Sequence, residues 1–274
     1  MIINPDTINP NTINPNTINL DIFNSDSLQL LRLLQITSPA LPVGAYSYSE
    51  GIEYLCSERT IQTESDLFDW LKRELSFGFV TNEAAIALRA HQSVLNGNLE
   101  SLKYWNNWFS ATRETEEIRL ASWQMGQSLM KLWCQLPEDI TLSKNRQKIA
   151  DFLPQAKENS QSNCKSNSQG NSIMQGCNYA IAFGIVAASL EIDARNTVVG
   201  YIYSWLSNLV SAAVRSVPFG QTSGQKIIFS LSSNILVSSQ FALQRVDSEL
   251  EWCGWGTSLA CANHETQYSR LFRS

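Results

Sequence analysis

The segment GQTSGQK at 220–226 is the part of this 274-residue chain that most resembles a phosphate-binding loop. Such a loop needs Gly, four residues and then Gly-Lys-Ser/Thr between a strand and a helix, so that backbone N–H groups and the lysine surround the phosphates. Here only three residues separate Gly220 from Gly224, and Gln225 stands where the lysine is required. The segment also follows a predicted helix. The sequence therefore does not favour nucleotide hydrolysis.

Two cysteines and a histidine, Cys253, Cys261 and His264, have the residue types that bind soft metal ions. Thiolate and imidazole ligands suit zinc, nickel or copper. The pattern is weak, because this spacing arises readily by chance. The second histidine, His91, falls on the inner face of a predicted helix, where a hydrogen-bonded core histidine is the simpler interpretation. A metallochaperone that binds nickel directly through Cys253, Cys261 and His264 stays an alternative function for this chain.

Composition and charge exclude several classes of protein. With 274 residues, 43% of them hydrophobic, the chain can bury a sizeable core in one domain. A net charge of −5, with no Lys/Arg run longer than two residues, gives no electrostatic footprint for nucleic acid or an anionic membrane. The six cysteines include no CxxC pair, which favours reduced thiols. No signal peptide is evident, so we expect a cytoplasmic protein.

The elements that must position any functional group are helices. No segment alternates with period two for long, so we predict an all-α protein, a single helical domain packed around a central buried helix at about 197–217. The polar residues of that helix fall on one narrow stripe, which needs hydrogen-bond partners inside a core. They are Ser204, Asn208, Ser211 and Arg215.

The end of this helix is marked by Pro218, which biases the preceding residue out of the helical region. Beyond it, Thr222 and Gln225 have the spacing of a capping box that would begin the next helix. We therefore expect Arg215 to be held by hydrogen bonds near the turn that starts at Gly220.

Other helices carry recognisable start signals. A helix beginning at Ser25 has leucines at 28, 31 and 34 on one face. Thr63, three residues before Asp66, predicts a capping box, and Thr115 is the predicted start of a long helix.

The long helix after Thr115 contains a glycine, Gly126, which costs helix stability and predicts a close crossing by another backbone. Arg119 and Trp123, four positions apart, have the spacing of a cation–π pair.

Two segments are expected to be disordered. Residues 1–24 contain NPDTI, NPNTI and NPNTI, whose Asn-Pro steps disfavour helix. A segment at about 154–177 is rich in Ser, Asn and Gln and has few large apolar residues. The domain organisation is thus a repeat tail at 1–24, followed by a helical domain at 25–274 with an insert.

Four motifs follow one another along the chain. The first is a shaped loop with Pro42, Gly44, Tyr46, Ser49, Gly51, Ile52 and Glu53, and the second is a helix with Glu117, Arg119, Ala121 and Gly126. The third comprises Ser216, Val217, Pro218, Gln221, Gly224 and Gln225, and the fourth His264, Glu265, Tyr268, Ser269, Arg270 and Leu271. From about Leu28 to Ser274 the chain resembles the UreF family of urease accessory proteins, which carries these four motifs in this order.

The resemblance implies a non-catalytic, all-helical chaperone or scaffold that joins UreD (UreH in some organisms) to the GTPase UreG during GTP-dependent nickel insertion into apo-urease. It implies no tightly bound cofactor, because nickel is handled by the complex and GTP is bound by UreG. A homodimer within the complex is expected. The residues expected to bind partners are the motif residues Tyr46, Ser49, Glu53, Arg119, Gln221, Gln225, His264, Tyr268 and Arg270, together with Arg215, which directly precedes the third motif.

The C-terminal segment has the composition of a docking surface. Tyr268, Leu271 and Phe272 lie beside Arg270, and Tyr and Arg are common hot-spot residues in interfaces. An exposed Leu-Phe pair gains little unless a partner covers it. We expect these side chains to be exposed for a partner. The alternative is that the tail folds back on its own domain, since chain ends are otherwise often mobile.

Overall fold

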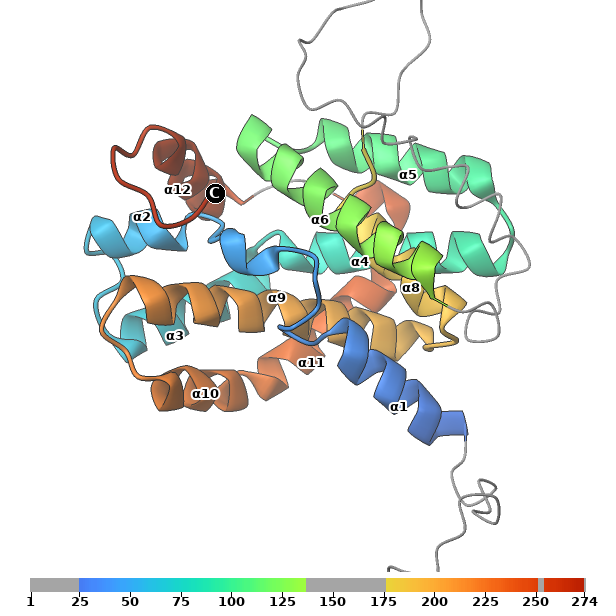
Figure 1. Ribbon diagram of the computed structural model, residues 1–274, viewed down its shortest axis with the longest axis horizontal. Helices are drawn as coiled ribbons and strands as arrows, with labels where there is room; N and C mark the ends of the chain where they lie inside the picture. The colour runs from blue at the N-terminus through green and yellow to red at the C-terminus, as the bar shows by residue number, and fades with distance from the viewer. Residues whose placement is uncertain (1–24, 137–175, 251–253, 274) are drawn as a thin grey trace, which may run out of the picture.

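The computed structural model describes residues 25–136, 176–250 and 254–273. Within these ranges the chain forms eleven α-helices and two short 3-10 helices and no strand (Figure 1). The all-α prediction is therefore confirmed. The repeat at 1–24, Cys253 and nearly all of the predicted insert lie outside the described residues.

The helices occur in the following order along the chain. They are α1 (Ser25–Ile36), η5 (Ala45–Ser47), α2 (Ile52–Ser57), α3 (Glu64–Phe77), α4 (Val80–Leu95), α5 (Leu99–Ala111), α6 (Glu116–Gln135), α8 (Tyr179–Ser189), α9 (Ala194–Ser216), α10 (Gln221–Ser230), α11 (Ser232–Gln244), η6 (Asp247–Glu249) and α12 (Trp255–Glu265).

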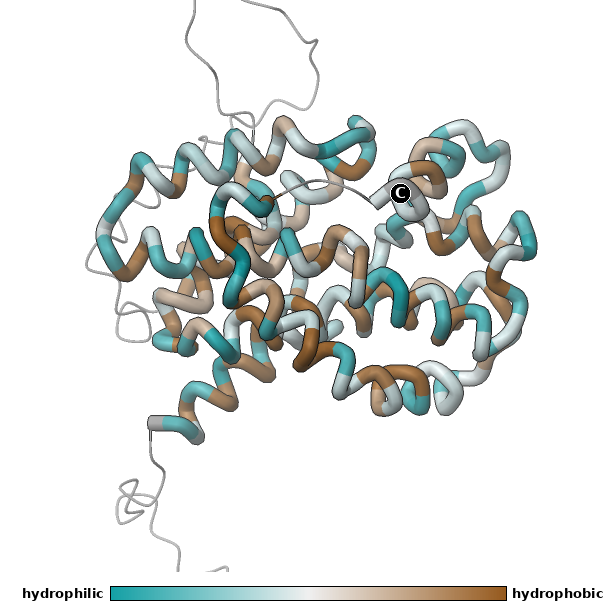
Figure 2. The backbone as a smooth tube through the Cα atoms, turned by 180° about the vertical axis from the view of Figure 1, so that it is seen from behind, coloured by the Kyte–Doolittle hydropathy of each residue, from teal (hydrophilic) through white to brown (hydrophobic). Residues whose placement is uncertain are grey.

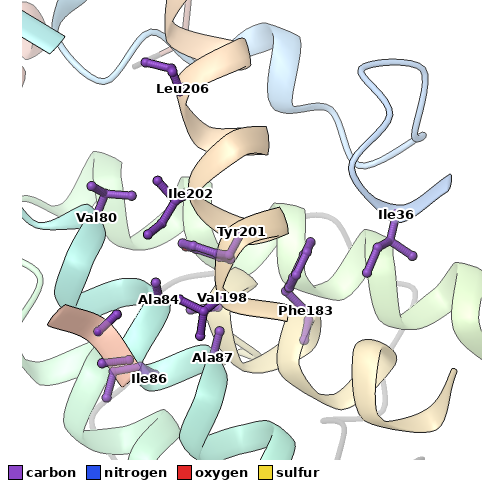
Figure 3. Packing of buried hydrophobic residues seen from close by; sticks show 14 of the residues in the cluster. Ile36, Val80, Ala84, Ile86, Ala87, Phe183, Val198, Tyr201, Ile202 and Leu206 are labelled. Atoms are coloured by element: carbon purple, nitrogen blue, oxygen red, sulfur yellow. The ribbon is translucent and has the colours of Figure 1, made fainter. Parts of the chain in front are cut away.

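The predicted central helix is α9, which crosses the middle of the molecule (Figure 1). It shares the core with α4 and α8. Figure 3 shows Val198 and Ile202 of α9 turned toward Ala84 and Val80 of α4. The ring of Tyr201 meets that of Phe183 on α8 edge to face, with 5.4 Å between centroids. By length and composition α9 could cross a membrane, but here it is a packed core helix.

Small residues let the core helices approach closely. A Cβ added to Gly126 on α6 would overlap the carbonyl oxygen of Cys177, which confirms the predicted close crossing. A Cβ added to Gly184 on α8 would overlap the carbonyl oxygen of Ala87 on α4 in the same way. Only glycine fits at these two crossings.

The helix starts agree with the sequence in three cases out of four, and the first of these is α1, which begins at Ser25 as predicted. Thr63 forms the predicted capping box with Asp66, and the Thr115 side chain accepts a hydrogen bond from Ile118 N–H. The predicted cap at Thr222 is wrong, because α10 already begins at Gln221. The extended backbone of Gly220 starts that helix without a side-chain cap.

The leucines of α1 mostly face outward. Leu28, Leu31 and Leu34 are 49%, 64% and 57% exposed, whereas Leu33 packs against the core. Figures 1 and 2 show α1 projecting from the rest of the fold, with hydrophobic residues along it. The three leucines therefore lie on one face of α1, as the sequence predicts, but no other part of the described chain buries that face.

The boundary of the predicted insert needs correction at its C-terminal end. Gly176 and Cys177 are buried, and the Asn106 side chain donates a hydrogen bond to the Gly176 carbonyl oxygen at 2.8 Å. Asn178, which follows, donates from its backbone to the Asn106 side chain at 2.9 Å. The chain is thus already part of the core at Gly176. Its buried polar groups there need hydrogen-bond partners, and Asn106 supplies them.

Candidate functional site

The C-terminal residues 266–273, here called the tail, fold back onto α2. Glu53 lies in the first turn of α2 and is 6% exposed. Its carboxylate accepts hydrogen bonds from the backbone N–H groups of Leu271 at 2.6 Å and Phe272 at 3.0 Å. Its Oε2 atom also lies 2.9 Å from His264 Nε2 at the end of α12. One buried carboxylate therefore fixes both α12 and the tail.

A second carboxylate joins the same group from α6. Glu117 Oε1 accepts from the Arg270 guanidinium at 3.1 Å, and Glu117 Oε2 lies 3.8 Å from His264 Nδ1. Burial raises the pKa of Glu117, while the nearby His264 and Arg270 oppose the rise. The tail, α2, α6 and α12 thus meet in one network of titratable and charged side chains.

Arg215 belongs to this region rather than to the turn at Gly220. Its guanidinium donates to the Tyr46 carbonyl oxygen at 2.9 Å and lies 4.4 Å from the centre of the Phe272 ring. The prediction that hydrogen bonds hold Arg215 is therefore confirmed, but its partners are the carbonyl oxygens of Tyr46 and Ser211 and not groups of the turn at Gly220. Side chains on a helix point back toward its N-terminus, so Arg215 reaches the loop beside α9 instead of the turn that follows.

The loop 44–53 connects this network to α9. Its backbone carbonyl at Tyr48 accepts from Asn208 at 3.3 Å, and its carbonyl at Ser47 accepts from Arg273 N–H at 2.8 Å. The Tyr48 hydroxyl donates to Gln124 on α6 at 2.7 Å. Two residues of the polar stripe predicted on the central helix, Asn208 and Arg215, therefore have partners in this loop, whereas Ser204 donates to the Tyr201 carbonyl oxygen of its own helix.

The tail is half buried and half exposed. Phe272 is 6% exposed, so the prediction of an exposed Leu-Phe pair is wrong for its aromatic member. Arg215 on one side of the ring and the Glu53 bond to its backbone hold Phe272 inward. Tyr268 and Leu271 remain 106% and 74% exposed.

The predicted site residues divide into two groups. Five of them meet around the tail and the loop 44–53: Tyr46, Glu53, Arg215, His264 and Arg270. Ser49 is fully buried in the same loop, and Tyr268 lies exposed on the tail.

The other three lie apart. Arg119 lies over the Trp123 ring at 5.8 Å, which confirms that predicted pair. Gln221 and Gln225 are exposed at the start of α10, and no hydrogen bond or ion pair described here joins them to the tail. Their predicted role in partner binding stays a prediction.

Sequence reasoning missed a buried polar cluster behind the loop. Glu83 on α4 forms an ion pair with Arg113 at 2.6 Å and accepts from the Tyr201 hydroxyl at 2.8 Å. Glu50 of the loop accepts from Trp205 Nε1 at 2.8 Å. Glu50 and Glu83 both line two adjoining hollows, of about 90 and 40 Å³. The available signal was a glutamate within the largely apolar segment VTNEAAIALRAHQSVL.

The two histidines and Cys261 are buried and do not form a metal site. His91 is a core histidine, with Nε2 2.7 Å from the Ile192 carbonyl oxygen. His264 Nε2 contacts Glu53, and burial raises the pKa of the Cys261 thiol, which disfavours a thiolate ligand. Among the described residues, no group of three or more His, Cys, Asp or Glu is placed to hold a metal ion.

Comparisons with known proteins identify the family. The UreF family model matches residues 61–232. The urease accessory protein UreF of Nostoc sp. is 44% identical over 244 residues, covering 89% of this chain and 95% of that protein. Those of Trichormus variabilis and Picosynechococcus sp. are 42% and 41% identical, covering 89% and 90% of this chain and 95% and 100% of the relatives. The chain therefore belongs to the UreF family of urease accessory proteins, and it is an accessory protein rather than an enzyme.

Proposed function

We propose that this chain joins UreD (UreH) to the GTPase UreG in the cytoplasm, so that nickel is inserted into apo-urease in a GTP-dependent step. In this proposal the chain carries no tightly bound cofactor, since the assembled complex handles nickel and UreG binds GTP. The observation that carries the proposal is the tail, which Glu53 fixes by two backbone hydrogen bonds while Tyr268 and Leu271 stay exposed.

A fixed and partly apolar tail suits partner binding on energetic grounds. The free energy of binding becomes more favourable when a partner covers exposed apolar groups, and tyrosine is a frequent hot-spot residue in interfaces. Because Glu53 and Glu117 already hold the tail in place, binding would cost less conformational entropy than it would for a mobile chain end. The exposed ring of Tyr46 lies on the neighbouring loop and extends the candidate surface.

A capture experiment tests this proposal. Immobilised chain is incubated with UreD and UreG, and the wild type is compared with Tyr268→Ala, Arg270→Ala and a chain ending at His264. We expect the three variants to lose most of the captured partners. Lys103→Ala on α5, which changes a lysine that forms an ion pair with the exposed Glu100, serves as the control. Full capture by all three variants would refute the role of the tail.

We also propose that a second copy of this chain covers the exposed leucine face of α1 in the complex. Leu28, Leu30, Leu31 and Leu34 expose 49–64% of their surface on one short helix. The helix carries one acidic and one basic residue, Asp26 and Arg32, so like-charge repulsion between two copies is small.

Light scattering coupled to size-exclusion chromatography tests the homodimer. The wild type should elute with twice the chain mass, and Leu31→Glu should elute as a monomer. Leu95→Glu, at an equally exposed leucine on α4, should remain dimeric. A wild-type monomer, or a Leu31→Glu dimer, would show that a second copy does not cover α1.

A further inference from the structure

The loop that holds the tail also sends a carboxylate into the interior. Glu50 lies between two positions that bind the tail, Ser47 and Glu53. Its φ of +48° is in the left-handed region, which a residue with a side chain adopts rarely and at an energetic cost. Its side chain is turned toward Trp205 and the hollows behind the loop. A displacement of Glu50 therefore shifts backbone that the tail contacts on both sides.

The charges around the hollows are unbalanced. The lining residues of the two hollows include two carboxylates, Glu50 and Glu83, and one guanidinium, Arg113. Arg113 makes a 2.6 Å ion pair with Glu83, and both side chains are at most 7% exposed. Glu50 itself is half-buried. An additional negative charge at Glu50 is costly beside the buried Glu83, and a proton on Glu50 removes it.

The titratable and charged groups that face Glu50 come from every element packed around it. They are Tyr48 of the same loop, Glu74 of α3, Glu83 of α4, Arg113 after α5, Tyr179 of α8, Tyr201 of α9 and Cys261 of α12. Burial, and next the charge of Glu83, raises the pKa of Glu50 to about 7, against the opposing effects of the Trp205 hydrogen bond and Arg113. The carboxyl group thus changes its charge near neutral pH.

We propose that protonation of Glu50 controls the position of the C-terminal tail. With a neutral Glu50, the loop 44–53 keeps its fold and the carboxylate of Glu53 holds the tail. When Glu50 loses its proton, repulsion from Glu83 and the need for hydration draw its side chain out of the interior. The loop then shifts, and the bonds from Glu53 to the tail weaken. The change in the tail is a property of the isolated chain. Only its consequence, a docking surface for partners that changes with pH, rests on the proposed function.

Nuclear magnetic resonance on the isolated chain tests the inference without any partner. The indole N–H of Trp205 reports the charge of Glu50 directly, because it donates to Glu50 Oε2. The amide N–H groups of Leu271 and Phe272 report the tail, because both donate to Glu53. We expect all three resonances to titrate with one shared midpoint near the pKa of about 7 given above. Trp205→Phe identifies the indole resonance.

Two variants make the test specific. Glu50→Gln removes the titrating proton and should abolish the shared transition in both the indole and the tail. Glu58→Gln, at an exposed glutamate just after α2, should leave the transition unchanged. If the indole resonance does not titrate in the wild type, Glu50 does not change its charge and the inference fails. If it titrates while the tail amides stay constant, the coupling is absent and the inference fails as well. Neither result bears on partner capture, so failure of this inference is distinct from failure of the proposed function.

Discussion

Glu53 and His264 are 211 positions apart in the sequence, yet Glu53 Oε2 lies 2.9 Å from His264 Nε2 in the interior. The same carboxylate accepts two backbone hydrogen bonds from the tail. Hydrogen bonds to a charged acceptor are stronger than neutral ones, and a buried carboxylate needs them. Glu53 is thus the residue through which the C-terminal segment becomes part of the fold.

Replacing Glu53 by Gln should loosen the tail. The substitution keeps the shape of the side chain but replaces one accepting oxygen by an NH₂ group, which faces N–H donors. We expect a loss of about 2 kcal/mol in the free energy of unfolding, the usual cost of leaving buried hydrogen-bonding groups unpaired. Urea denaturation measures it, and Glu58→Gln serves as a control at an exposed site near the end of α2. Equal stability of the two variants would contradict the anchoring role.

The glycine crossings offer a test of the core. Gly126→Ala places a methyl group where the carbonyl oxygen of Cys177 lies, so α6 and the segment that enters α8 must separate. We expect destabilisation of about 1–3 kcal/mol, as for other overpacked cores. Gly220→Ala, where an added Cβ meets no atom within 4 Å, should stay within about 0.5 kcal/mol of the wild type. Thermal unfolding of the two variants should therefore differ clearly, and similar melting temperatures would show that the crossing has room.

His91 should make stability depend on pH. Burial lowers the pKa of His91 below its ordinary value of 6.5, so the folded state binds fewer protons than the unfolded state as pH falls through that value. The free energy of unfolding therefore decreases with acidification below about pH 6.5. His91→Gln loses a titrating group but can still donate to the Ile192 carbonyl oxygen. Its stability difference from the wild type should shrink as pH falls from about 7.5 to about 5.5, and a constant difference would argue against a neutral buried His91.

Local signals allowed much of the helical framework to be predicted. The caps at Thr63 and Thr115 and the close crossing at Gly126 follow from short-range chemistry, and the structure has all three. His91 was placed correctly because its spacing on an amphipathic helix points to the core. The cap at Thr222 failed because a glycine just before it can begin a helix without a side-chain bond.

The site could be predicted only in part, since its geometry depends on contacts between distant segments. The motifs selected Glu53, His264 and Arg270, but which of them touch each other is fixed by the packing of α2, α6 and α12. The pairing of Glu83 with Arg113 has no local pattern, because the two residues meet only when α4 and the end of α5 pack together. The burial of Phe272 was missed for the same reason.

The proposed function is tested most directly by the nickel content of urease matured with variants of this chain. Cells or a reconstituted system lacking their own UreF receive the wild type, Arg270→Ala or the control Lys103→Ala, and nickel per urease active site is measured after purification. The proposal predicts full nickel loading with the wild type and with Lys103→Ala, and nickel-poor urease with Arg270→Ala at equal amounts of folded chain. Full loading with Arg270→Ala and with a chain that ends at His264 would contradict it.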